Sequence, residues 1–558
     1  MGNFYYNLCG GLNTQLTPVM MGADTKKMYW ADGFNVEPYK NQGIARQKGN
    51  KTMLEISALI KPKTDETLPE QDTENNNEAE TLSVEALTEE SKPPLTGSDL
   101  SAFSPVALVA YPKGGENFLL GLSDGRVFAF DRAASSLRAV YDFGVETVNF
   151  AFEYFLDGIV ILPKTQSGKP LDGIYYNPSM KNPVEFLNFK TADGEAISGG
   201  AVCGYAGRLW ISSGDTLYYS ALGTFNDWTT SHDAGYISKF HSSTSEILAL
   251  KEYGGSLAIY KEHEVFLLTG TDPETFAITK FADKGAAGPG SVLTCNNKQY
   301  FFNDCGLFSL SLAGELSQIV MGQNRAQNIA KMFEKLDKAR LSSIVILALE
   351  IKNQIWIFPP IKGETGQKEV WIYDFALESW FTRIIPYEIT VAASASGEIL
   401  TVTPESGGKI FIENSGNTFN GKPVKFSFST PFFHFSKPTD KKIVEEFEII
   451  CDGGFENNFE FSISTDYAAE NVTKPENVRQ ISPNVLAWEE NSGVMGSAVW
   501  AGSGFQGGGI WADTIQEGIK LDIFEANKAV QLHFQGTKAG QDLAIIGFEF
   551  KGIIYEDA

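Results

Sequence analysis

FLLGLSDGRVFAFD, residues 118–131, places an apolar run on each side of the dipeptide Asp124-Gly125. An Asp-Gly pair between apolar runs favours a tight hairpin, because glycine adopts the positive φ angles that such turns require. The stretch therefore predicts two antiparallel strands joined by a short turn. Similar strand–turn–strand units begin further along the chain, at residues 157, 208, 256, 299, 354 and 398.

The seven units recur in steps of 39 to 55 residues. A pure β repeat of this period is typical of the blades of a β-propeller. Six or seven periods predict a six- to eight-bladed ring over residues 98–416. The units share a shape but no fixed signature, such as a repeated Trp-Asp pair, so two stacked sandwiches remain an alternative to the ring.

Alternating strands without this period follow residue 421. KPVKFSFSTPFFHF, KKIVEEFEIICDG and LAIIGFEFKGIIY are examples, and they predict an antiparallel β-sandwich over residues 417–558. The predicted fold class is therefore all-β, a β-propeller plus an antiparallel β-sandwich. One helix is predicted within the ring, over residues 326–340, where apolar residues at helical spacing form a single stripe: Ile329, Met332, Phe333 and Leu336. We expect it to pack on the side of the ring, the alternative being a helix that binds a partner.

The charge of the chain is strongly acidic and unevenly distributed. Its 558 residues include 45 Lys and Arg against 69 Asp and Glu, a formal net charge of −24. Residues 64–91 contain ten of the acidic side chains and no Lys or Arg, which predicts an acidic insertion over residues 51–97 that cannot fold alone. So acidic a chain is poorly suited to gripping nucleic acid by its phosphates, although DNA could pass it without sticking.

Features of secretion and membrane insertion are missing from the sequence. The five cysteines lie far apart and form no C-x-x-C pair, which predicts reduced thiols and synthesis in a cytoplasm. The opening MGNFYYNLCGG lacks the basic and apolar regions of a signal peptide. No window approaches the roughly 18 apolar residues of a transmembrane helix, so no membrane-spanning segment is expected.

No motif in the sequence singles out a catalytic residue, a cofactor or a metal site. His263-Glu264 begins a metalloprotease-like motif, but Leu267 occupies the position of the second histidine, so we expect His263 to be a surface residue of a hairpin. GAAGPG, residues 285–290, lacks the following helix of a phosphate site and predicts a turn. These observations favour a structural or binding protein over an enzyme, although paired carboxylates for glycoside hydrolysis stay open.

The first fifty residues contain the most specific motif. Gly10-Gly11-Leu12-Asn13 is followed by Thr17-Pro18, then by ADGFN at residues 31–35 and GIARQKG at residues 43–49. This order resembles the opening of the tail hub, or nozzle, proteins of short-tailed bacteriophages, also called tail tubular or packaged-DNA stabilisation proteins. Residues 257–305 and 429–466 are similar to two further stretches of that family.

The resemblance implies a structural virion protein that forms the distal part of a short phage tail and lines the channel for genome retention and ejection. It implies a homohexamer below a head-to-tail adaptor protein, with a tail fibre or spike outside and a plug or needle at the tip. Genomic DNA would pass through without sequence-specific binding. The protein would be made in the host cytoplasm and reside in the virion tail.

The same resemblance marks a set of motif residues for docking: Gly10, Gly11, Leu12, Asn13, Asn35, Arg46 and Gly49. Many relatives have arginine and proline before the final glycine, where this chain has Arg46-Gln47-Lys48-Gly49. We expect residues 1–50 to add strands to the sandwich, because so short a stretch cannot build a core of its own; the alternative is a free arm that reaches a neighbouring subunit. The alternative function is a carbohydrate-binding or glycan-degrading β-propeller protein.

Overall fold

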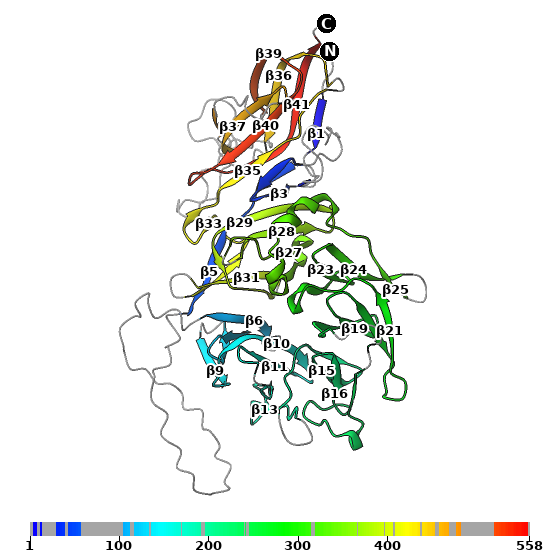
Figure 1. The fold of residues 1–558 in the computed structure, drawn as a ribbon. Helices are drawn as coiled ribbons and strands as arrows, with labels where there is room; N and C mark the ends of the chain where they lie inside the picture. The colour runs from blue at the N-terminus through cyan, green and yellow to red at the C-terminus, as the bar shows by residue number, and fades with distance from the viewer. Residues whose placement is uncertain are drawn as a thin grey trace, which may run out of the picture.

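A computed structural model shows an all-β molecule with a propeller and a sandwich, which confirms the predicted fold class (Figure 1). The structure describes residues 4–7, 12–13, 30–39, 43–56, 104–111, 117–132, 136–168, 170–190, 196–238, 240, 245–313, 318–364, 367–395, 397–404, 408–435, 438–451, 457–467, 476–480 and 518–555. The acidic run at residues 64–91 lies outside this set. In Figure 1 the sandwich stands at one end of the molecule and the propeller fills the other.

The first three blades are four-stranded antiparallel sheets whose strands follow chain order. Blade 1 consists of β6 (Pro105–Tyr111), β7 (Asn117–Leu122), β8 (Arg126–Asp131) and β9 (Ser136–Asp142). Blade 2 consists of β10 (Thr147–Phe155), β11 (Gly158–Thr165), β12 (Ile174–Tyr176) and β13 (Val184–Phe186). Blade 3 consists of β14 (Val202–Tyr205), β15 (Arg208–Ser213), β16 (Thr216–Tyr219) and β17 (Gly235–Ile237).

The next three blades repeat the pattern. Blade 4 consists of β18 (Ala249–Tyr253), β19 (Ser256–Tyr260), β20 (Val265–Thr269) and β21 (Ala277–Ala282). Blade 5 consists of β22 (Val292–Cys295), β23 (Lys298–Asn303), β24 (Gly306–Ala313) and β25 (Gln318–Met321). Blade 6 consists of β26 (Val345–Leu349), β27 (Gln354–Phe358), β28 (Gln367–Asp374) and β29 (Ser379–Ile389). The hairpin quoted first from the sequence is β7–β8, and Gly125 turns it with a φ of 89°.

Blade 7 closes the ring with a strand from the other end of the sequence. It consists of β30 (Val391–Ala395), β31 (Glu398–Thr403), β32 (Lys409–Glu413) and β5 (Asn50–Glu55), with β33 (Thr418–Phe419) and β34 (Lys422–Pro423) beyond them. β5 pairs antiparallel with β32, from Asn50 opposite Glu413 to Glu55 opposite Lys409. The first strands of blades 7 and 1, β30 and β6, contact each other. Residues 51–55, which the sequence analysis assigned to the acidic insertion, therefore lie in the strand that completes the last blade.

The predicted helix at residues 326–340 forms two short 3-10 helices, η5 (Gln327–Lys335) and η6 (Lys338–Ser343). The chain is extended at Leu336, with a φ of −63° and a ψ of 131°, and this interrupts the helix. The apolar stripe is nevertheless packed, because Ile329, Met332 and Leu336 are buried in the core. The remaining 3-10 helices of the described chain are η3 (Thr230–His232), η4 (Pro289–Ser291) and η7 (Glu350–Lys352).

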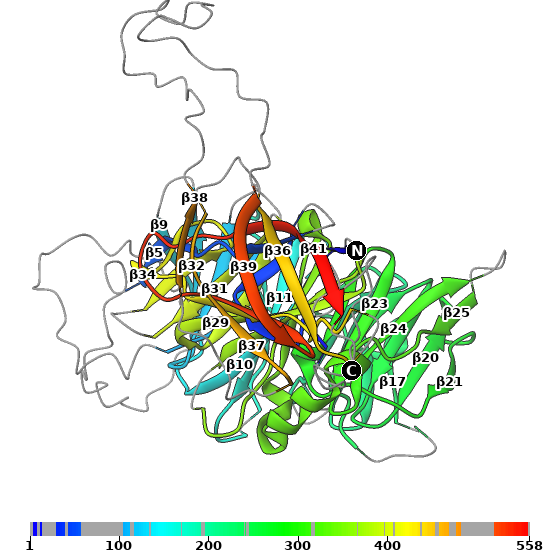
Figure 2. The ribbon, with the colours of Figure 1, turned by 90° about the horizontal axis from the view of Figure 1, so that it is seen from above.

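The sandwich contains strands from both ends of the chain. One sheet has the order β3 (Val36–Tyr39), β4 (Gly43–Arg46), β41 (Ala544–Tyr555), β36 (Lys442–Cys451) and β39 (Gly518–Asn527), and β1 (Phe4–Asn7) also pairs with β41. The other sheet has the order β2 (Asp32–Phe34), β35 (Phe426–Ser429), β40 (Val530–Gly536), β37 (Asn457–Thr465) and β38 (Glu476–Gln480). Figure 2 looks down on these strands, with the propeller sheets spreading beyond them.

Stacked phenylalanines fill the space between the two sheets of the sandwich. Phe534 of β40 lies parallel to Phe428 of β35, with ring centres 4.5 Å apart, and it also stacks on Phe548 of β41 at 5.5 Å. Phe447 and Phe461 make a second contact across the sheets, at 6.0 Å. These rings belong to one continuous apolar core that extends through Leu12, Trp30 and Val36 of the N-terminal segment into blades 5 and 6.

Deleting residues 1–49 tests how far the sandwich depends on the N-terminal strands. The deletion removes β1 to β4 and bares one edge of β41 and one edge of β35, and open strand edges pair with other chains. We expect the truncated protein to aggregate at micromolar concentration, as measured by light scattering and size-exclusion chromatography. A soluble truncated monomer with unchanged thermal unfolding would show that the strands are a dispensable arm.

Candidate functional site

The N-terminal motif lies at the junction between the propeller and the sandwich. Leu12, Asn13 and Asn35 are buried there, with 4%, 5% and 2% of their surfaces exposed, and Arg46 and Gly49 lie on the same segment. Gly10 and Gly11 lie outside the described residues. The motif residues that the structure describes are thus brought together, although up to 37 positions separate them in sequence.

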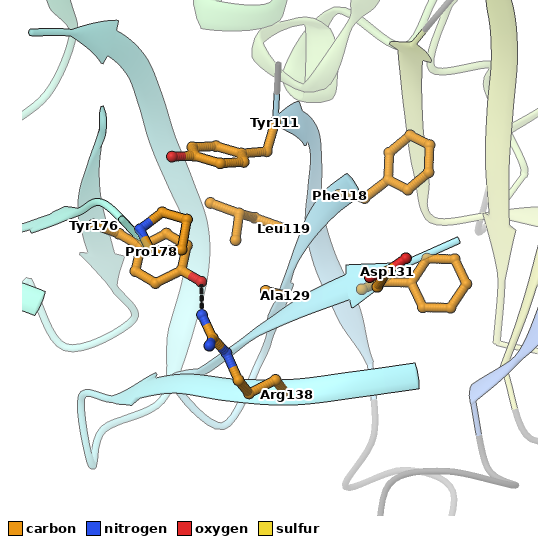
Figure 3. A pocket seen from close by; sticks show the side chains of 9 residues that line it. Tyr111, Phe118, Leu119, Ala129, Asp131, Arg138, Tyr176 and Pro178 are labelled. Atoms are coloured by element: carbon orange, nitrogen blue, oxygen red, sulfur yellow. Dashed lines mark hydrogen bonds between the residues drawn. The ribbon is translucent and has the colours of Figure 1, made fainter. Parts of the chain in front are cut away.

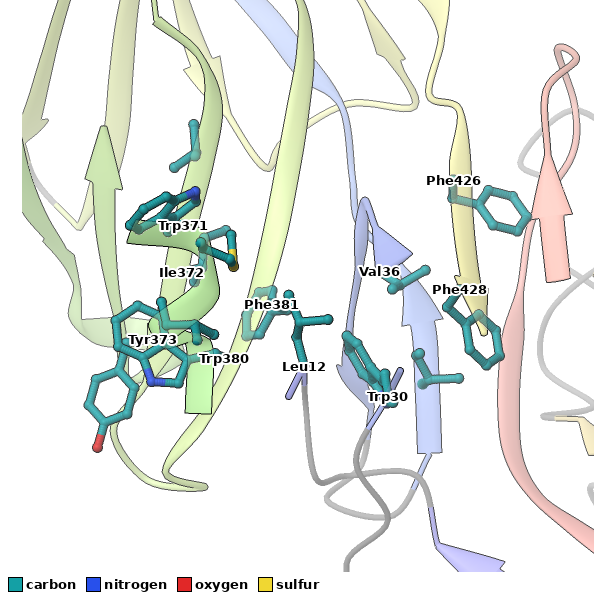
Figure 4. Packing of buried hydrophobic residues seen from close by; sticks show 14 of the residues in the cluster. Leu12, Trp30, Val36, Trp371, Ile372, Tyr373, Trp380, Phe381, Phe426 and Phe428 are labelled. Atoms are coloured by element: carbon teal, nitrogen blue, oxygen red, sulfur yellow. The ribbon is translucent and has the colours of Figure 1, made fainter. Parts of the chain in front are cut away.

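An apolar layer forms one side of this junction (Figure 4). Leu12 and Trp30 lie between Trp380 and Phe381 of blade 6 and Phe428 of the sandwich, and all five are buried. Burial of these side chains stabilises the segment, at roughly 25 cal/mol per Å² of apolar surface. The segment therefore acts as a shared core layer for the two domains.

Backbone hydrogen bonds fix the segment along the outer strand of blade 6, β29. The Leu12 amide donates to the Trp380 carbonyl at 2.5 Å, and the Asn35 amide donates to the Thr382 carbonyl at 2.9 Å. The Ile384 amide donates to Oδ1 of Asn35 at 2.8 Å. These partners alternate along β29, as expected for the free edge of a strand. The motif covers that edge, which would otherwise be open to pairing with another chain.

Asn35 connects the propeller to the sandwich through its side chain. Its Nδ2 donates to the Ile384 carbonyl of β29 at 3.1 Å and to the Lys425 carbonyl, just before β35, at 2.7 Å. Its backbone has a φ of 55°, a left-handed conformation that asparagine tolerates better than most residues. Both the conformation and the hydrogen bonds therefore favour asparagine at this position.

The most buried charge in the junction is the guanidinium of Arg383 on β29. Its Nη1 donates to the Lys48 carbonyl at 2.7 Å, and its Nη2 donates to the Gly49 carbonyl at 3.0 Å and to Oε2 of Glu413 at 2.6 Å. Both side chains of the ion pair are 0% exposed. The rings of Trp356 and Phe419 cover the guanidinium, with centres 5.3 and 4.6 Å from its carbon.

The other carboxylate oxygen of Glu413 accepts hydrogen bonds from two hydroxyl groups. Tyr387 donates to Oε1 at 2.8 Å and Thr401 donates at 2.7 Å. Burial and the neighbouring carboxylate raise the pKa of Tyr387 far above its ordinary value, so its hydroxyl remains a donor at neutral pH. Asn50, the first residue of the closing strand, donates to the Tyr387 hydroxyl. The network therefore joins the N-terminal segment to blades 6 and 7.

The three remaining motif residues have separate contacts. The Asn13 amide donates to the Trp30 carbonyl at 3.1 Å. Arg46 makes a two-pronged ion pair with Asp542, through Nε at 2.9 Å and Nη2 at 3.1 Å, which ties β4 to the turn before β41. Gly49 passes so close to Thr418 that an added Cβ would overlap the Thr418 backbone. All the described motif residues thus have roles within the chain, and their docking onto another protein stays a prediction.

The N-terminal side of the junction carries a recognisable sequence motif, and the propeller side does not. The partners Arg383, Tyr387 and Glu413 were not singled out, because they lie more than 330 residues beyond the motif. Their signal was a charge within an apolar strand, as in WFTRIIPY at residues 380–387. His263 lies in a hairpin turn with its side chain 80% exposed, which confirms its interpretation as a surface residue.

Other groupings of reactive side chains are sparse in the described regions. His533 lies between two serines, with Nδ1 2.8 Å from Ser429 Oγ and Nε2 2.7 Å from Ser464 Oγ, and burial lowers its pKa. The described residues contain no cluster of three or more His, Cys, Asp or Glu side chains suited to a metal ion. No helix among them is long and apolar enough to cross a membrane.

Comparisons with known proteins give little beyond this geometry. No protein-family model matches the chain, and no curated protein matches it in sequence. Among solved structures, the chain is similar to one described as "Structure of U3-55K", with 8% sequence identity and a TM-score of 0.36. That match covers 56% of this chain and 95% of the other.

Substituting Arg383 with methionine tests the buried ion pair. The variant keeps most of the side-chain volume but leaves the Glu413 carboxylate buried without its cation, a change that typically costs about 3–5 kcal/mol. We expect a loss of that size in the free energy of unfolding, measured by urea denaturation. Arg325→Met is the control, because the Arg325–Glu378 pair is exposed and should contribute no more than about 1 kcal/mol. Equal losses in both variants would contradict the role given to Arg383.

Substituting Asn35 with glycine separates its hydrogen bonds from its backbone conformation. Glycine accepts the positive φ, so the variant loses only the side-chain contacts to both domains. We expect a loss of about 2–3 kcal/mol in unfolding free energy, since buried partners are left unsatisfied. Asn353→Gly is the control, because Asn353 has a φ of 59° and is exposed; it should be nearly neutral. An unchanged unfolding free energy in Asn35→Gly would show that the Asn35 side chain does not stabilise the junction.

Proposed function

We propose that this chain is a structural protein of a short bacteriophage tail, the distal hub or nozzle that lines the channel for genome retention and ejection. In this role six copies surround the tail axis below a head-to-tail adaptor protein. A fibre or spike attaches outside, and a plug or needle closes the tip. The chain performs no catalysis and needs no cofactor in this role, and it resides in the virion tail.

The observation that carries the proposal is the use of the N-terminal motif, the stretch most similar to tail hub proteins. Its described residues lie at the junction between the propeller and the sandwich. There Asn35 donates hydrogen bonds to both domains, and the buried Arg383 guanidinium donates to the carbonyls of Lys48 and Gly49. A wall that retains pressurised DNA must transmit force between its parts without hinging. A junction with a shared core and a buried ion pair suits that demand better than a flexible linker does.

The charge of the chain also supports a channel wall. A formal net charge of −24 repels the phosphate backbone, so DNA can pass along the wall without binding to it. The same charge opposes closure of a ring from free subunits. We therefore expect the adaptor to act as the template on which six copies assemble.

A carbohydrate-binding or glycan-degrading propeller is the second candidate function. The observation that favours it is a cavity between blades 1 and 2, lined by aromatic, cationic and acidic side chains. This candidate does not exclude the first, because a tail protein meets the glycans of the host surface.

Negative-stain imaging and native mass spectrometry together test the hub proposal. Images of virions treated with an antibody against this chain should show the label on a sixfold tube at one capsid vertex. The isolated chain should be a monomer in the mass spectrometer at micromolar concentration, because its like charges oppose ring closure. Label on the capsid surface, or no label on virions, would contradict the hub role. A stable hexamer of the isolated chain would contradict only the expectation that the adaptor is needed as a template for assembly.

A further inference from the structure

A cavity of about 270 Å³ lies between blades 1 and 2 of the propeller (Figure 3). Tyr111, Asp131 and Tyr176 of its lining are the last residues of β6, β8 and β12. Nine residues line it: Tyr111, Phe118, Leu119, Ala129, Phe130, Asp131, Arg138, Tyr176 and Pro178. The side chains of Phe118 and Phe130 belong to the core that blade 1 shares with blade 7, so the aromatic rings between blades 1 and 2 are those of Tyr111 and Tyr176. The volume is close to the lower end of the range of known ligand pockets, roughly 300–1,000 Å³.

A comparison between blades shows that this cavity departs from the repeat. Tyr205 and Tyr253 end the first strands of blades 3 and 4, as Tyr111 ends that of blade 1. The Tyr205 hydroxyl donates to the Gly255 carbonyl, and the Tyr253 hydroxyl to the Asn297 carbonyl, at 3.2 and 2.7 Å. Each of these carbonyls lies in the first turn of the following blade. A tyrosine at this position is thus used elsewhere in the ring to latch one blade to the next.

Tyr111 lacks the corresponding latch. Its side chain belongs to a residue that is 5% exposed, and its hydroxyl has no hydrogen-bond partner among the described residues. In the following turn, the Leu156 carbonyl accepts a hydrogen bond from Tyr175 instead. An unsatisfied buried hydroxyl typically costs about 1–3 kcal/mol. Burial raises the pKa of Tyr111 to about 12, so the group is a neutral donor at physiological pH.

Arg138 faces the same cavity from the outermost strand of blade 1, β9. Its Nη2 donates to the Tyr176 hydroxyl, and its guanidinium carbon lies 5.9 Å from the centre of the Tyr176 ring. The Tyr176 ring in turn lies 5.9 Å from the Tyr111 ring. Figure 3 shows Tyr111 and Arg138 on opposite sides of the lining, with Tyr176 and Leu119 between them. A guanidinium has five N–H donors, so the exposed Arg138 retains donors for a ligand.

We propose that this cavity binds a saccharide unit, with its apolar face against the aromatic lining and its hydroxyl groups hydrogen-bonded to Tyr111, Arg138 and Asp131. The inference does not depend on the hub role; it rests on the second candidate function and names its site and ligand class. A ligand hydroxyl then accepts the hydrogen bond of Tyr111, in the place of the carbonyl that the next blade supplies to Tyr205 and to Tyr253. No covalent step is involved.

The chemistry of the lining favours a saccharide over other small ligands. A purely apolar ligand would give the Tyr111 hydroxyl no hydrogen-bond partner. The free-energy penalty of the unsatisfied group would therefore remain. A phosphate or nucleotide is disfavoured, because the Asp131 carboxylate lines the same small space as Arg138. A sugar ring combines an apolar face with hydroxyl groups that both donate and accept, which suits tyrosine, arginine and aspartate together.

Saturation-transfer NMR on the full-length chain tests the proposal, with D-glucose, D-galactose, N-acetyl-D-glucosamine and D-glucuronic acid as separate probes. We expect transfer to at least one sugar, and the glucuronic acid arm shows whether a carboxylate strengthens the contact with Arg138. Tyr111→Phe keeps the ring and removes the hydroxyl, so binding should weaken about tenfold. Its melting temperature should stay the same or rise, since an unsatisfied group is removed.

Two further variants make the result specific. Tyr205→Phe is the matched control, because its hydroxyl bonds to Gly255; it should melt at a lower temperature and bind the sugar as the wild type does. Arg138→Ala alters an exposed side chain and should weaken binding while the fold is kept. No transfer to any of the four sugars overturns the proposal, as does binding that survives both Tyr111→Phe and Arg138→Ala.

Discussion

The guanidinium of Arg383 lies in the interior of the protein, and three parts of the chain must be in place before it can be buried there. The N-terminal segment supplies the carbonyls of Lys48 and Gly49, blade 7 supplies Glu413, and β29 of blade 6 supplies the arginine itself. A buried charge without its partners is strongly destabilising, so none of the three can leave without cost to the other two. The closing strand β5 begins directly after this contact. The same N-terminal segment therefore takes part both in closing the ring and in attaching the sandwich.

The propeller could be predicted from sequence because its information is local. Each hairpin is specified by a turn such as Asp124-Gly125 between apolar runs. The recurrence of such hairpins every 39 to 55 residues predicts the blades of a ring. The closing strand could not be found in this way, since NKTMLE at residues 50–55 contains no turn and little alternation, and its partner β32 lies about 350 residues away. The apolar stripe of the predicted helix was correct, since its residues pack in the core. The single helix was wrong, because the chain is extended at Leu336 and forms two 3-10 helices.

The junction could be predicted only in part for the same reason. The motif was visible as a pattern of glycine, asparagine and arginine, yet nothing in it shows that Asn35 caps the edge of a strand from another domain. A charge such as Arg383 within an apolar strand indicates a buried partner without identifying it. Tyr111 is a similar case, because only the structure shows that its hydroxyl lacks the hydrogen bond to the next blade that Tyr205 makes. These features arise from long-range pairing, which a local pattern does not contain.

Differential scanning calorimetry of the full-length protein tests most directly whether the propeller and the sandwich form one mechanical unit. If the shared N-terminal segment and the Arg383–Glu413 pair couple them, both should unfold in a single transition, with a van't Hoff enthalpy equal to the calorimetric enthalpy. Two separate transitions in the unmodified protein, with the sandwich melting while the propeller persists, would show that the domains are independent and would contradict the account.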